Sequence, residues 1–90
     1  MANVTVTKTT NGIKVEFNDL SEAAGRKKGY WRKDKIRFDL GVNDSCVTVT
    51  VQDEPQWCVT WDTGFIIDSV DGVAPTSNSD LYDKLIAILG

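Results

Sequence analysis

The feature that most constrains the fold is the alternation of apolar and polar residues over positions 4–17, interrupted by Asn11-Gly12. Apolar residues recur at every second position on both sides of this dipeptide, which is the period of a half-buried strand. Asn-Gly is a strong hairpin signal because both residues tolerate positive φ in a type I′ turn. A two-residue loop there pairs Lys8 with Val15, which places the apolar residues of both strands on one face. The sequence therefore predicts a first hairpin over residues 1–19.

Further strands are predicted between residues 36 and 70. Ile36–Leu40 and Val47–Val51 alternate in the same way and are separated by turn-forming residues. Placing Phe38 opposite an odd-numbered valine requires a two-residue loop at Asn43-Asp44, or a four-residue loop of the same parity. Proline lacks the donor that a central strand needs, so Asp53-Glu54-Pro55 is predicted to end this hairpin. Short strands are then expected over residues 56–61 and 65–67.

One helix is predicted, over residues 77–89. Ser77 can cap its N-terminus, and Asp80 follows three positions later, where an acid also suits the helix dipole. The apolar residues that follow have helical spacing and form a stripe that needs a surface to pack on: Leu81, Leu85, Ile88 and Leu89, widened by Tyr82 and Ile86. Covering one face of its own sheet is the default for such a stripe.

Length and composition fit a single domain over residues 1–90. Hydrophobic residues make up 41% and charged residues 26%, the balance of a globular protein. The expected fold class is α+β: a small antiparallel, hairpin-built sheet or partly open barrel of about five or six strands with one C-terminal helix. No apolar run approaches the roughly 20 residues of a membrane helix, and Met1-Ala2-Asn3 does not resemble a signal peptide. We therefore expect a soluble protein with no membrane partner.

The absence of histidine removes several chemistries. No Ser-His-Asp or Cys-His arrangement and no His-ligated metal site can form. Cys46 and Cys58 lie twelve positions apart and form no CxxC pair. A disulfide requires that their strands be neighbours, and the favoured interpretation is two small hydrophobes in a β core. We expect no catalytic residue, no metal and no cofactor.

The charge is distributed unevenly along the chain. The net charge is −3, but residues 26–37 hold seven basic residues against one acid, a local charge of +6. Residues 38–90 hold nine acids and only Lys84, a charge of −8. The protein is therefore predicted to be bipolar, with its cations in a loop over residues 20–35 and at the start of the next strand.

Three interpretations compete for this basic segment. It can be a solvated loop anchored by its aromatic residues, or a surface that attracts the acidic face of a second copy. Nucleic-acid contact ranks lower, because the overall acidity repels a polyanion. If the segment binds a partner, the cations supply attraction and the two rings supply the anchor. The candidate binding residues are Arg26, Lys27, Lys28, Tyr30, Trp31, Arg32 and Lys33.

The C-terminal segment from Asp71 to Leu85, with the sequence DGVAPTSNSDLYDKL, resembles small proteins encoded in the structural modules of bacteriophages. The resemblance implies a virion component such as a capsid decoration, head-to-tail or tail protein, located in the virion or in the host cytoplasm before assembly. The expected partners are copies of the chain itself or other virion proteins. The alternative is a small phage-encoded protein that binds nucleic acid, or a regulator or inhibitor, using the segment 26–37.

Overall fold

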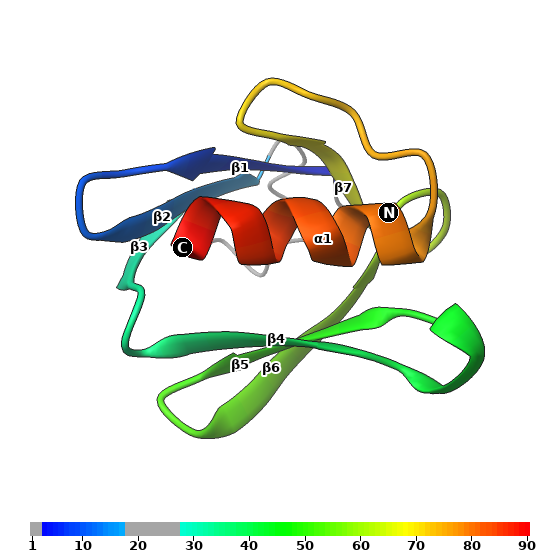
Figure 1. Cartoon of the computed structure of the whole chain (residues 1–90), viewed down its shortest axis with the longest axis horizontal. Helices are drawn as coiled ribbons and strands as arrows, with labels where there is room; N and C mark the ends of the chain where they lie inside the picture. Colours follow the sequence, from blue (N-terminus) through cyan, green and yellow to red (C-terminus); the bar gives the residue numbers. More distant parts are fainter. Residues whose placement is uncertain (1–2, 18–27) are drawn as a thin grey trace.

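The computed structural model describes residues 3–17 and 28–90, which form a small β-rich domain with one C-terminal helix (Figure 1). A single turn of 3₁₀ helix, η1 (Val42–Asp44), separates two of the strands. The strands are β1 (Asn3–Lys8), β2 (Gly12–Phe17), β3 (Lys28–Arg32), β4 (Ile36–Leu40), β5 (Val47–Val51), β6 (Glu54–Thr60) and β7 (Phe65–Val70), and the helix is α1 (Asn78–Leu89).

The sheet has more strands than expected and is mixed rather than antiparallel. Its seven strands lie in the order β3-β2-β1-β7-β6-β5-β4. Two antiparallel units, β1 to β3 and β4 to β6, are joined by β7, which runs parallel to both β1 and β6. The strand expected over residues 65–67 is too short, because the apolar run Phe65–Ile67 is only the first half of β7. Ile67 and Val70 are both buried, as expected for a strand with neighbours on both sides.

The sheet curls without closing into a barrel. β3 and β4 are its two edges, yet they are consecutive in the chain and are joined by the turn Lys33–Lys35. The amide of Lys35 donates to the carbonyl of Arg32 (2.9 Å), as in a β-turn. Away from this turn the two edges diverge, and α1 lies across the opening between the two units (Figure 1). The helix therefore takes the place of the missing edge-to-edge pairing.

The core lies between the curled sheet and α1. Leu81 and Leu85 are 0% and 1% exposed and insert among buried valines and isoleucines of the strands. Tyr82, Ile88 and Leu89 pack at its margin, whereas Ile86 is 41% exposed and does not join the stripe as expected.

The first hairpin is present, but its turn lies earlier than Asn11-Gly12 predicts. The strands pair Lys8 with Ile13, and Thr9 donates to the carbonyl of Gly12 (2.9 Å), so that Thr10 and Asn11 form the loop. Gly12 instead belongs to β2 and lies against β3. A Cβ at Gly12 would lie 1.9 Å from the carbonyl oxygen of Trp31. Glycine is therefore needed at this position because β3 approaches β2 closely, and not because the chain turns there.

The second hairpin has the expected register, with an even number of loop residues. Phe38 lies opposite Val49, and Gly41 donates to the carbonyl of Cys46 (2.8 Å) across a four-residue loop. The next strand begins earlier than expected, since Pro55 lies within β6 beside a bulge, a position that tolerates a missing donor.

The cysteines are not core hydrophobes, which corrects the interpretation favoured above. Cys46 and Cys58 form a disulfide with their Cα atoms 5.9 Å apart. Cys58 is exposed, because it alternates with the buried Val59 and lies on the outer face of β6. The bridge joins neighbouring strands at the outside of the second unit.

The N-terminus of α1 is capped as predicted. Ser77 Oγ accepts from the amide of Asp80 (3.0 Å). The Asp80 carboxylate accepts from the Thr76 amide (2.9 Å) and hydroxyl (3.2 Å) and pairs with Lys84 (3.1 Å). The Thr76 amide and then Lys84 lower the pKa of Asp80.

The lowered pKa predicts a pH-dependent stability. Because the pKa of Asp80 is lower in the folded protein than in the unfolded chain, its ionised carboxylate stabilises the fold at any pH above the unfolded-state pKa of about 4. This stabilisation is lost as the pH falls through the folded-state pKa. Urea unfolding across the acid range should therefore show the wild type losing stability more steeply than Asp80→Asn. Parallel pH profiles for the two proteins would contradict this assignment.

The disulfide between Cys46 and Cys58 should stabilise the fold by closing a loop of the chain. By loop-closure entropy, replacing both cysteines with alanine should lower the free energy of unfolding by about 3 kcal/mol. Thermal unfolding measures this with and without a thiol reductant. The reductant should lower the midpoint of the wild type and leave the double variant unchanged. Equal midpoints for both proteins in oxidising buffer would show that the bridge contributes nothing.

Candidate functional site

The predicted basic loop is in part a strand. Residues 28–32 form β3, an edge strand of the sheet that pairs with β2. Of the seven candidate residues, Lys28, Tyr30, Trp31 and Arg32 belong to β3, and Lys33 begins the turn to β4. Arg26 and Lys27 lie outside the described residues. The polar, glycine-containing sequence of β3 hides its strand character, because pairing with β2 rather than apolar alternation holds it in place.

Trp31 is the inward-facing residue of β3. It lies opposite the buried Ile13, and its indole folds back over Gly29, where a Cβ would come within 2.3 Å of the ring. Across the interior, Trp31 meets Trp57 of β6 edge to face, with ring centroids 5.5 Å apart. Trp57 in turn lies 6.3 Å from Phe65. Trp31 therefore ties the edge strand to the opposite unit of the sheet.

Tyr30 faces the other way. It is 62% exposed and lies opposite Lys14 on the outer face of β2 and β3. Lys14 pairs with Glu16 (3.0 Å), and this hydrogen bond raises the pKa of Lys14. Tyr30 is therefore an exposed ring flanked by cations, while Trp31 is a structural anchor.

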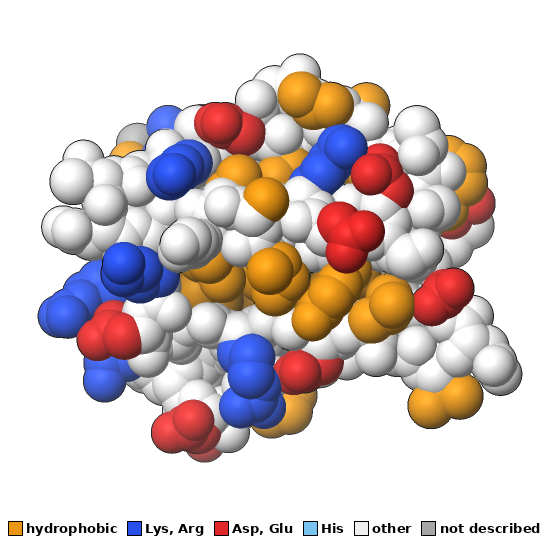
Figure 2. Space-filling view, viewed as in Figure 1, with side chains coloured by type: hydrophobic (Ala, Val, Ile, Leu, Met, Phe, Trp, Pro, Cys, Tyr) orange, Lys and Arg blue, Asp and Glu red, His pale blue; other side chains and the backbone are white. Residues whose placement is uncertain are grey.

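The cations around the turn form one surface, which we call the basic end: Arg32, Lys33, Lys35 and Arg37. Figure 2 shows Lys and Arg side chains gathered at the end of the molecule where β3 joins β4. Arg32 pairs with Asp34 (3.1 Å) and Arg37 with Asp39 (2.9 Å), and the Asp39 contact raises the pKa of Arg37. Among the described residues, Lys33 and Lys35 have no carboxylate partner.

The internal ion pairs do not neutralise the basic end. Its four cations face two carboxylates, which leaves a net charge of +2. All four paired side chains are more than half exposed, and exposed pairs of this kind contribute about 0–1 kcal/mol each. An incoming carboxylate can therefore replace Asp34 or Asp39 at little cost.

The turn that carries these cations is held from both sides. The amide of Lys33 donates to the carbonyl of Asn11 (2.8 Å), and the amide of Gln52 donates to the carbonyl of Lys35 (2.8 Å). These bonds extend the β2–β3 and β4–β5 ladders into the turn. The backbone of the basic end is therefore ordered, and its exposed cationic side chains project from it into solvent.

Two hollows open beside the basic end. We call the first the aromatic hollow; it has a volume of about 350 Å³ and lies between the β1–β2 turn and β3. It is lined by Thr9, Thr10, Asn11, Ile13, Tyr30, Trp31 and Arg32. The second, of about 470 Å³, lies between the β3–β4 and β5–β6 turns and includes Lys35 and Arg37. Sequence reasoning did not select Lys35, Arg37 or the β1–β2 turn for the site, although both cations belong to the +6 segment.

A third hollow, of about 310 Å³, lies beside Trp31 and Trp57 and is lined also by residues of β5, β6 and the turn between them. The interior void at the centre of the core has a volume of about 20 Å³, which is too small for any ligand larger than a water molecule. Residues 3–17 and 28–90 contain no cluster of three or more potential metal ligands. Within the same ranges, no helix has the length and apolarity to cross a membrane.

No protein-family model, curated protein or solved structure matches this chain. Any proposal of function therefore rests on the geometry and charge of the basic end and on the sequence resemblance of residues 71–85.

The opposite orientations of Tyr30 and Trp31 predict different effects on stability. Trp31→Ala should lower the free energy of unfolding by about 3 kcal/mol, since it removes a ring packed on Trp57. Tyr30→Ala should change it by less than about 1 kcal/mol, because the ring is exposed. Urea unfolding of the two variants measures both values. Equal losses would mean that Tyr30 is also part of the core.

Proposed function

We propose that this chain is a non-enzymatic interaction module that docks through its basic end on an acidic protein surface. Its setting is a bacteriophage particle, where it serves as a capsid decoration, head-to-tail or tail protein. Docking uses the cations of the basic end for attraction and Tyr30 as the exposed aromatic contact. Arg, Tyr and Trp are the residue types that most often dominate protein interfaces.

The observation that carries the proposal is the excess of positive charge that an acidic domain presents on a hydrogen-bonded turn. Lys33 and Lys35 lie on a turn that is hydrogen-bonded to the β1–β2 turn on one side and to Gln52 on the other. Because the backbone of this turn is already ordered, binding costs little backbone conformational entropy. Complementary charge on a partner then accelerates encounter and fixes orientation.

The phage setting is supported by the resemblance of residues 71–85 to small phage structural proteins. This segment comprises the connection after β7 and the first two turns of α1, both remote from the basic end in sequence. It belongs to the framework of the fold, since Pro75, Leu81 and Leu85 are buried. The resemblance therefore supports the class of protein that we propose, and the basic end supports the surface through which it binds its partner.

Nucleic-acid binding is the second candidate, favoured by the position of Tyr30 between Lys14 and Arg32. An exposed ring beside cations can stack on a base while the cations meet phosphates. The acidity of the rest of the chain opposes it, since the net charge is −3. Titration with a thymidine oligonucleotide at increasing salt separates the two, because phosphate contacts give affinity that falls steeply with salt.

Incorporation into particles tests the proposal. Mass spectrometry of purified particles from a strain carrying the gene should detect the chain at a fixed copy number. Supplied in place of the wild type, Lys33→Glu should reduce incorporation at least about tenfold, because reversal of a contacting charge costs more than about 1.4 kcal/mol.

The matched control is Lys84→Glu, which reverses a lysine of α1 that lies outside the basic end and outside the two hollows beside it. Particles should incorporate it like the wild type. Absence of the chain from particles, or equal loss with Lys84→Glu and Lys33→Glu, would overturn the proposed function.

A further inference from the structure

At the far end of the second hairpin, Val42 stands out in solvent. It is 83% exposed, the highest value among the described large hydrophobic residues. It begins η1, in which Asn43 and Asp44 both have φ near 56°, the left-handed region that residues other than glycine rarely adopt. Asn and Asp adopt this conformation more readily than other residues with a side chain, and contacts with neighbouring elements hold it here. We call residues 42–45 the tip.

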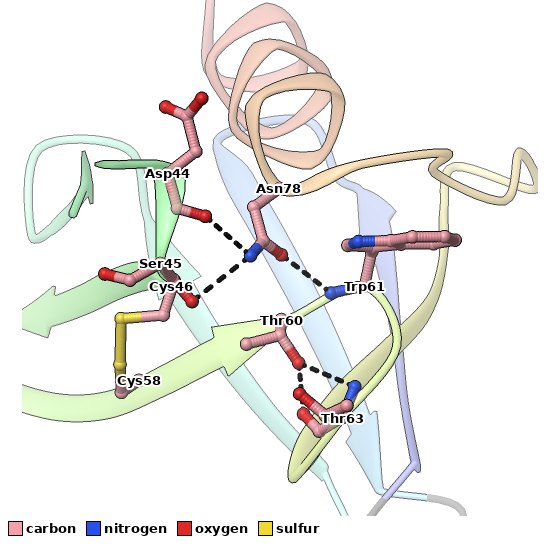
Figure 3. The surroundings of a disulfide bond; sticks show 8 residues. All are labelled: Asp44, Ser45, Cys46, Cys58, Thr60, Trp61, Thr63 and Asn78. Carbon is pink, nitrogen blue, oxygen red and sulfur yellow. Dashed lines mark hydrogen bonds between the residues drawn. A yellow bond between two sulfur atoms is a disulfide. The ribbon is translucent and has the colours of Figure 1, made fainter. Parts of the chain in front are cut away.

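Those contacts are shown in Figure 3. Asn78, the first residue of α1, donates through Nδ2 to the carbonyls of Asp44 (2.9 Å) and Ser45 (3.2 Å). Its Oδ1 accepts from the amide of Trp61 (3.0 Å). One half-buried amide therefore joins the tip, the β6–β7 turn and the helix.

The covalent brace lies directly after the tip. Cys46 is bonded to Cys58 of β6, and its carbonyl accepts from Gly41 across the base of the loop. The tip is thus fixed at both ends although its own side chains point to solvent. A rigid loop that exposes an apolar side chain binds with a small entropic penalty.

The charge around the tip is opposite to that of the basic end. Asp44 lies on the tip, and the exposed Asp62 lies on the neighbouring turn. Residues 38–83 contain no lysine or arginine. In Figure 2 the charged side chains visible at this end are acidic, whereas the cations gather at the other end. The molecule therefore presents complementary charges at opposite ends of its sheet.

The aromatic hollow has the chemistry to receive the tip. The half-buried Trp31 and the exposed Tyr30 supply its apolar surface, the buried Ile13 lies beneath them, and Arg32 lies at its rim beside Lys33. A valine side chain fits a hollow of about 350 Å³. Cations border the hollow at Arg32 and Lys33, just as an acid, Asp44, lies two residues after Val42 on the tip.

From these observations we infer that the partner of the basic end is a second copy of this chain. The tip of one copy inserts Val42 into the aromatic hollow of the next, and Asp44 faces Arg32 and Lys33. This inference rests on the proposed function, for which it names the partner. Because the two surfaces differ, the contact is heterologous, and repetition builds a ring or an open chain.

Sedimentation velocity over a range of protein concentrations tests this contact. At low salt the wild type should form oligomers, and high salt should dissociate them. Asp44→Lys and Lys33→Glu should each raise the dissociation constant at least about tenfold, because each juxtaposes like charges. Mixing the two variants should restore association, since each reversed surface then meets its complement.

A pair of apolar positions supplies the matched control. Val42→Asp should abolish association, whereas Val73→Asp, at another exposed valine, should leave it unchanged. Circular dichroism checks that every variant is folded. A wild type that is monomeric at all concentrations, charge variants that associate normally, or a mixture that stays monomeric would each overturn the inference. Particle incorporation that depends on Lys33 but not on Lys84 would still support docking on a different virion protein.

Discussion

The short turn between β3 and β4 is the constraint on which the rest of the structure depends. These strands are the two edges of a seven-stranded sheet, yet only Lys33–Lys35 separate them in the chain. The sheet must therefore curl until its edges meet at this turn, and it opens again beyond it. α1 covers that opening with Leu81 and Leu85, while the Trp31–Trp57 contact fills the interior near the turn.

The same constraint places the charges. Cations that flank a tight turn at the meeting of two edges cannot enter the core, so they project together at one end of the molecule. The disulfide and Asn78 fix the opposite end, where Asp44 and Val42 are exposed. Ends of unlike charge can attract one another in a heterologous contact between copies. In the assembly proposed above, the framework holds these two contact surfaces apart.

The sequence predicted those elements whose signals are local. The parity of the second hairpin and the Ser77 cap were correct because alternation and capping depend on near neighbours. The sequence placed the first turn one residue too late because Gly12 looks like a turn residue. In the structure Gly12 instead allows the close approach of β3, a contact that is distant in sequence. β3 itself carries no apolar alternation, and the Cys46–Cys58 bond depends on strand neighbours that composition does not reveal. The candidate cations were recognised from their density, but the hollow beside them required the tertiary fold.

The central claim is that the basic end and the tip meet in the same contact. Amide nitrogen–proton correlation spectra of the wild-type chain, recorded at increasing concentration and low salt, test it most directly. We predict that shifts and broadening concentrate in two groups of amides, Tyr30–Lys35 and Val42–Ser45, and that salt reverses both together. Perturbation confined to the exposed face of α1 around Ile86, or spectra independent of concentration, would contradict the account.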